Sequence, residues 1–130
     1  MISDEYRNVM AAIKWGAEYF IKCHTGEYEF YGHVGNTEEL NEYWGRPEDL
    51  DEVYDTISFK CNVKKPCSDL LAETAAALAA AHVIFKGFDD SFAKKCLKHA
   101  VGLYKFANQY RGSYHESIKD AGTRKGSTSN

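Results

Sequence analysis

The most unusual group in this sequence is a carboxyl near the start of its most apolar segment. Glu73 follows Ser68 and Asp69, and the residues around it are mostly Ala and Leu. A buried carboxylate without a partner is costly, so this group must be protonated, paired with a cation or bound to a metal. Calcium takes carboxylates and carbonyls in this manner. The alternative is a Glu73 side chain that reaches solvent or a neighbouring Lys or Arg.

A second candidate is the aromatic residue Trp44, which lies between Tyr43 and Arg46 in a segment without helical periodicity. Its ring is suited to stack on a sugar or a base. A lone tryptophan in a loop also serves as a packing anchor, and the residues alone leave both interpretations open.

The remaining polar residues show no catalytic pair. The five histidines form no HExxH pair, and the chain has no GxSxG, Walker A or GxGxxG motif. A histidine zinc site is therefore not expected. The histidines are His24, His33, His82, His99 and His115.

Composition excludes several classes of protein. The chain has 130 residues, which allows one domain or one piece of a larger one. Its net charge of −3 argues against a nucleic-acid-binding protein. No apolar run approaches the ~20 residues of a membrane span, so no membrane partner is expected. The first seven residues lack the pattern of a signal peptide.

Four cysteines leave the redox state open. The closest two, Cys61 and Cys67, are too far apart for a CxxC motif. Two disulfides with three possible pairings, or scattered free thiols, both fit the spacing. Cys96 lies in a helical pattern, where a small buried side chain is expected.

Three main helices are expected, together with a long loop. Apolar residues recur at steps of three and four from Ser3 to about His24, and Ser3 is an N-cap. A second helix covers residues 68–86 with Ser68 as its N-cap, and a third runs from a cap at residues 89–91 to about Tyr110. A short strand or extended loop is expected at 28–34, one long irregular connection at 35–67, and a disordered tail at 121–130.

The second helix is apolar almost all round, which is typical of a helix covered on several sides. Three helices cannot easily cover it. The chain is therefore predicted to be part of a larger helical domain or to dimerise.

Five segments, in order, resemble glycoside hydrolase family 9, the endo-β-1,4-glucanases, and most closely its animal type. These segments are residues 14–25, 28–36, 43–49, 68–81 and 110–114. The resemblance implies an all-α fold, part of an (α/α)6 barrel, with residues 1–120 as a partial catalytic domain. It implies hydrolysis of internal bonds of cellulose with inversion, a β-1,4-glucan as partner and a secreted protein.

The resemblance also assigns residues. The family's catalytic Asp pair and catalytic Glu belong to motifs that these 130 residues do not contain, so the isolated chain is expected not to cleave cellulose. Trp44 matches the tryptophan of a histidine–tryptophan pair in the sugar-binding cleft. Asn41 takes the place of the histidine, and Tyr110 is a further candidate for the cleft. The calcium-binding members use positions that match Ser68, Asp69, Glu73 and Glu116.

A second hypothesis is a degenerate, non-enzymatic helical module that keeps only carbohydrate or partner binding. The Asn41 substitution and the divergent segment 50–66 favour it.

Overall fold

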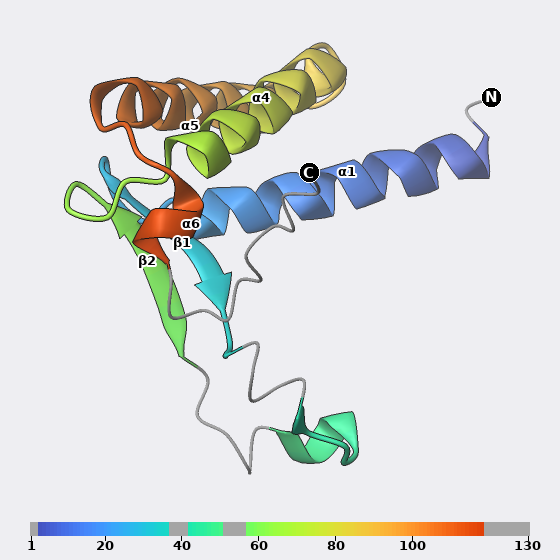
Figure 1. Ribbon diagram of the computed structural model, residues 1–130. Helices are drawn as coiled ribbons and strands as arrows, with labels where there is room; N and C mark the ends of the chain where they lie inside the picture. Colours follow the sequence, from blue (N-terminus) through green and yellow to red (C-terminus); the bar gives the residue numbers. More distant parts are fainter. Residues whose placement is uncertain (1–2, 37–41, 51–56, 119–130) are drawn as a thin grey trace, which may run out of the picture.

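The structure is a computed structural model that describes residues 3–36, 42–50 and 57–118. Three long helices, α1 (Asp4–Cys23), α4 (Ser68–Phe85) and α5 (Asp90–Gln109), form most of it. As Figure 1 shows, α4 and α5 lie side by side and α1 runs along them, with a two-stranded sheet near the C-terminal end of α1. The prediction of three main helices is confirmed. The predicted tail, 121–130, lies outside the described residues.

Helix α1 begins and ends where its sequence indicates. The Ser3 hydroxyl accepts a hydrogen bond from the Tyr6 amide, and Asp4 and Glu5 place negative charge in the first turn. The His24 amide donates to the Phe20 carbonyl and closes the last turn.

Helices α4 and α5 form an antiparallel hairpin around the core. Gly87 takes a left-handed φ of 84° at the turn between them, where side-chain-bearing residues are strained. Asp89 then caps α5 by accepting from the Phe92 amide, and Lys14 of α1 pairs with this same carboxylate at 2.9 Å. The Lys14 ammonium lowers the pKa of Asp89. The largest fully buried side chains are Phe85, Phe106, Leu71, Leu78 and Leu103.

The long connection is more regular than predicted. It contains the short helix η1 (Pro47–Asp49) and the strand β2 (Ser58–Asn62), which pairs antiparallel with β1 (Glu29–Val34). Phe59 and Cys61 alternate with polar residues, which is the period of a strand, but the run is too short to be decisive alone. Pairing with β1, with Phe30 opposite Cys61, defines it as a strand.

One side of α4 is left uncovered by the described residues. Leu71, Leu78 and Phe85 are buried, whereas Val83 is 72% exposed. By length and composition α4 could cross a membrane, but core helices of soluble proteins pass the same test and one such helix is weak evidence. The uncovered side fits the prediction that α4 requires partners beyond these helices. Its exposed apolar residues are Ala72, Ala76, Ala77, Ala79, Ala80, Val83 and Ile84.

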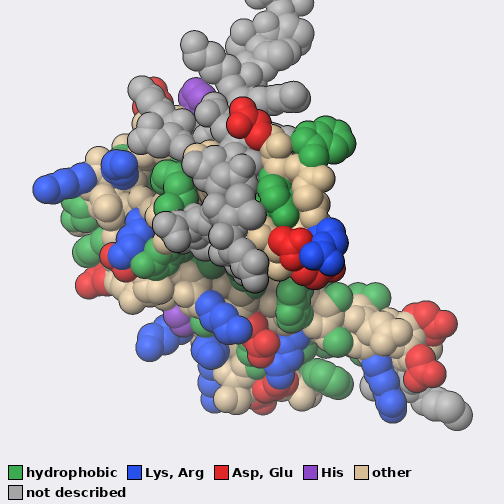
Figure 2. Space-filling view, turned by 90° about the horizontal axis from the view of Figure 1, so that it is seen from below, with side chains coloured by type: hydrophobic (Ala, Val, Ile, Leu, Met, Phe, Trp, Pro, Cys, Tyr) green, Lys and Arg blue, Asp and Glu red, His purple; other side chains and the backbone are tan. Residues whose placement is uncertain are grey.

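Charge is mixed rather than concentrated on the face seen in Figure 2, where basic and acidic side chains alternate with hydrophobic ones.

The core predicts a strong difference between two apolar truncations on α4. Leu78→Ala should lower the free energy of unfolding by about 2–5 kcal/mol, because it leaves a cavity between α4 and α5. Val83→Ala, at an exposed position of the same helix, should change it by less than about 0.5 kcal/mol. Urea unfolding followed by circular dichroism measures both; equal losses would contradict this description of the core.

Candidate functional site

A tight turn holds Trp44 out from the surface. The Tyr43 hydroxyl donates to the Arg46 carbonyl at 3.0 Å, and the Arg46 guanidinium pairs with Asp49 at 2.8 Å. The Tyr43 ring lies against Gly45, and a Cβ at this position would require that ring to shift. The Trp44 side chain itself is 96% exposed. Within the described residues it is therefore not a packing anchor, and its ring is free to stack on a flat ligand.

Tyr110, the other predicted substrate-binding residue that the structure describes, does not lie beside Trp44. Tyr110 packs edge-on against Tyr28 and Phe106, with ring centroids 5.2 and 6.0 Å away. Tyr28 lies directly before β1. The turn that contains Trp44 follows the opposite end of β1, as Figure 1 shows. A six-residue strand spans roughly 20 Å. Asn41 lies outside the described residues.

The start of α4 is joined to the segment that follows α5. The Ser68 hydroxyl donates to the Gly112 carbonyl at 3.0 Å and accepts from the Gly112 amide at 3.1 Å. Both carboxylate oxygens of Asp69 accept from the Tyr114 amide, at 2.9 and 3.1 Å. We call these four residues the α4 clasp. Partial burial raises the pKa of the Tyr114 phenol, and the charge of Asp69 adds to the shift.

The N-cap prediction for α4 was wrong by one residue. Cys67 occupies the N-cap position, and Ser68 is the first helical residue. The Ser68 hydroxyl is instead used by the clasp, since Gly112 offers both a donor and an acceptor at short distance.

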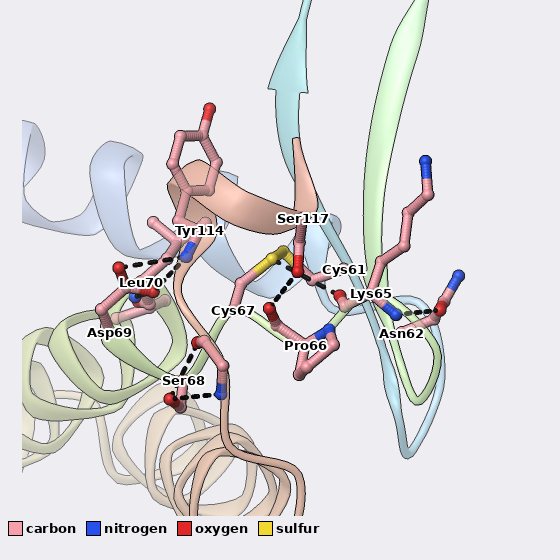
Figure 3. Close-up of a disulfide and its surroundings, with 12 residues drawn as sticks. Cys61, Asn62, Lys65, Pro66, Cys67, Ser68, Asp69, Leu70, Tyr114 and Ser117 are labelled. Carbon is pink, nitrogen blue, oxygen red and sulfur yellow. Dashed lines mark hydrogen bonds between the residues drawn. A yellow bond between two sulfur atoms is a disulfide. The ribbon is translucent and has the colours of Figure 1, made fainter. Parts of the chain in front are cut away.

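A disulfide holds the clasp from the other side. Cys61 of β2 is bonded to Cys67, and both residues are fully buried, whereas Cys23 and Cys96 are free and buried. Figure 3 shows this disulfide beside the clasp, with the Ser117 hydroxyl donating to the Pro66 carbonyl. The chain therefore forms one disulfide and keeps two free thiols, rather than two disulfides. The pairing of β1 with β2 was the missing signal, because it brings Cys61 next to the start of α4.

The predicted calcium ligands are only partly assembled. Asp69 and Glu73 line one shallow hollow with Tyr114, but Glu116 of α6 (Tyr114–Ser117) is exposed and does not line it. Glu73 is also exposed, so of the two interpretations the one in which its side chain reaches solvent is confirmed. It lies on a side of α4 that the described residues do not cover. Within residues 3–36, 42–50 and 57–118, no three acidic, His or Cys side chains cluster closely enough to suggest a metal site.

Comparison with known proteins agrees with this arrangement. The family model "Glycosyl hydrolase family 9" matches residues 2–128. Endoglucanase 15 of Oryza sativa subsp. japonica is 43% identical over 125 residues, which are 96% of this chain and 20% of that protein. Endoglucanase 19 of Arabidopsis thaliana is 41% identical over 114 residues, which are 88% of this chain and 18% of that protein.

Solved structures give the fold. The endoglucanase of the termite Nasutitermes takasagoensis superimposes with a TM-score of 0.84 and 45% identity, covering 89% of this chain and 26% of that chain. The cellulase Cel9M of C. cellulolyticum superimposes with a TM-score of 0.73 and 27% identity, covering 86% and 31%.

Together the helices, the hairpin and the matched segments define a piece of a six-hairpin helical glycosidase. The chain belongs to glycosyl hydrolase family 9. The predicted fold class, all-α and part of an (α/α)6 barrel, is confirmed. The chain spans about a fifth of the length of the curated relatives it matches.

The clasp predicts a clear effect of Asp69. Asp69→Ala removes the acceptor for the Tyr114 amide and should lower the free energy of unfolding by about 1–3 kcal/mol. Glu73→Ala, one turn further along the same exposed side, is the control and should change it by less than about 0.5 kcal/mol in EDTA. Urea titration measures both, and an Asp69 variant as stable as the control would rule out the clasp as a stabilising contact.

Proposed function

We propose that this chain is a segment of an endoglucanase that hydrolyses internal β-1,4-glucosidic bonds of cellulose with inversion. It supplies scaffold and part of the sugar-binding cleft, and it does not carry the catalytic carboxylates. The family match and the names of the relatives support the reaction class. The observation that carries the role in binding is the nearly complete exposure of Trp44 on a turn fixed by its own hydrogen bonds.

The chemistry of Trp44 suits a glucan. The axial C–H groups of a β-glucose ring form an apolar face, which packs on an aromatic ring. Polar groups beside the ring are required to orient the hydroxyls of the sugar. We infer that Asn41 donates or accepts such a hydrogen bond. We also infer that Tyr110 contacts the sugar only when other segments of the whole enzyme complete the cleft between Tyr110 and Trp44.

The second candidate function is a non-enzymatic carbohydrate- or partner-binding module. The Asn41 substitution and the divergent segment 50–66 favour it. The uncovered apolar side of α4 favours the segment of an enzyme instead, because a self-sufficient module would bury that side. A cooperative unfolding transition of a monomer, without binding of a hydrophobic dye, would support the module.

Calcium binding and secretion are further parts of the proposal. Ser68, Asp69 and Glu73 offer the hydroxyl and carboxylate oxygens that calcium prefers, with Glu116 as a fourth candidate. The buried Cys61–Cys67 disulfide supports an oxidising compartment outside the cell. If calcium binds, millimolar CaCl₂ should raise the melting temperature of the wild type but not of Glu73→Gln; the same melting temperature in CaCl₂ and EDTA would argue against the site.

The pure 130-residue chain is expected to release no reducing sugar from carboxymethylcellulose, since it does not contain the family motifs that carry the catalytic carboxylates. A termite-type endoglucanase assayed in parallel is the positive control. Turnover above the buffer blank would refute the assignment of the catalytic groups to other parts of the enzyme.

Trp44 predicts selective loss of sugar binding. Trp44→Ala should weaken binding of cellohexaose at least about tenfold, which corresponds to ~1.4 kcal/mol, because the stacking surface is removed. Trp15→Ala is the matched control, since Trp15 is also an exposed tryptophan, 76% exposed on α1 and away from the turn. Isothermal titration calorimetry measures both variants. Equal affinities of the two variants would exclude the Trp44 turn as the sugar contact.

A further inference from the structure

Two histidines join the C-terminal end of α1 to the middle of α5. The Nδ1 atoms of His24 and His99 lie 2.9 Å apart, and the rings meet edge-on at 76° with centroids 5.0 Å apart. A hydrogen bond between two imidazole nitrogens requires a proton on one and a lone pair on the other. The contact therefore depends on the protonation of both rings.

The second nitrogen of His24 restricts the pair further. Among the described residues, Nε2 of His24 is the buried side-chain atom that has no hydrogen-bond partner. Gly102 lies against the ring, and a Cβ at that position would come within 3.0 Å of the His24 Cε1 atom. A hydrogen on Nε2 would be buried without an acceptor, which is costly. The neutral pair avoids this cost when His24 Nδ1 donates to His99 Nδ1 and Nε2 carries only its lone pair.

The surroundings oppose a positive charge on either ring. Burial is the larger effect and lowers the pKa of His24; the backbone of Gly26 and Glu27 acts in the opposite direction, but neither residue forms a hydrogen bond with the buried Nε2 atom. Burial also lowers the pKa of His99, with contributions from His24 and from the nearby lysines. The charged groups that face the pair or line the adjoining surface are Glu27 in the turn after α1 and Lys94, Lys95, Lys98 and Lys105 on α5.

We propose that the His24–His99 pair is a pH-sensitive latch between α1 and α5. A proton added to either ring places a hydrogen on His24 Nε2, where it has no acceptor. When both rings are protonated, the Nδ1–H groups of His24 and His99 face each other and neither can accept a hydrogen bond. Acidification therefore loosens the junction that holds the turn into β1 against α5, independently of any sugar or calcium site.

The direction of the effect follows from the lowered pKa values. As the pH falls below about 6.5, the pKa of a free imidazole, the two histidines of the unfolded chain take up protons. The same histidines in the folded chain remain neutral at that pH. The contribution of the neutral pair to the free energy of unfolding is therefore fully present above about pH 6.5. It is lost as the pH falls from about 6.5 toward the pKa values of the two rings in the folded chain. The unfolding equilibrium constant should rise by up to about tenfold per pH unit for each proton taken up.

Urea unfolding of the full 130-residue chain at pH 7.5, 6.5 and 5.5 tests the latch. His99→Gln keeps an amide that can face His24 Nδ1 but does not titrate, so its pH dependence should be shallower than that of the wild type. His115→Gln, at an exposed histidine of α6, is the control and should keep the slope of the wild type. The same slope in all three proteins would overturn the proposal.

A measurement on the wild type alone covers the case in which His99→Gln does not fold. Two-dimensional ¹H–¹⁵N spectra of the imidazoles report tautomer and titration midpoint for each ring. The latch requires the proton of neutral His24 on Nδ1 and midpoints below about 6.5 for both rings. A neutral His24 protonated on Nε2, or midpoints at or above that value, would overturn it.

Discussion

The packing of α4 against α5 is the contact on which the rest of the structure depends. Leu71, Leu78 and Phe85 of α4 and Leu103 and Phe106 of α5 belong to one core cluster, and all five are fully buried. Helices α1 and α6 pack on this hairpin, and the disulfide joins β2 to the start of α4. The Asp89 cap at the turn also binds Lys14 of α1, and the clasp at the open end binds the segment after α5.

The two ends of the hairpin are held by different chemistry. At the closed end, a charged pair on the surface joins Lys14 of α1 to Asp89 and adds to the apolar packing of α1 on the core. At the open end, the buried Cys61–Cys67 disulfide, the Ser68–Gly112 pair and the Asp69 carboxylate act on neighbouring residues. The Asp69 carboxylate at the start of α4 therefore holds the backbone at Tyr114 through its own hydrogen bonds, which require no bound cation.

Much of this arrangement could be predicted from the sequence because local signals agree with tertiary contacts. Ser3, Gly87 and Asp89 define helix ends through their own side chains or backbone freedom, and the structure places the ends there. Strand β2 and the disulfide could not be predicted, since both depend on the pairing with β1, which is distant in sequence. The sequence left Glu73 undecided between burial and solvent, because its apolar neighbours in the sequence lie on a side of α4 that the described residues leave open.

Two of the candidate sugar-binding residues, Trp44 and Tyr110, lie apart within this chain. In a helical barrel each hairpin positions its neighbours, and a cleft forms only where the loops of several hairpins meet. Here a single hairpin and a β-ribbon hold Trp44 and Tyr110 at opposite ends of β1. Each residue is locally ordered, Trp44 by its turn and Tyr110 by its aromatic neighbours. The local order of each residue and the placement of the two residues at opposite ends of β1 are therefore both set by contacts within this chain.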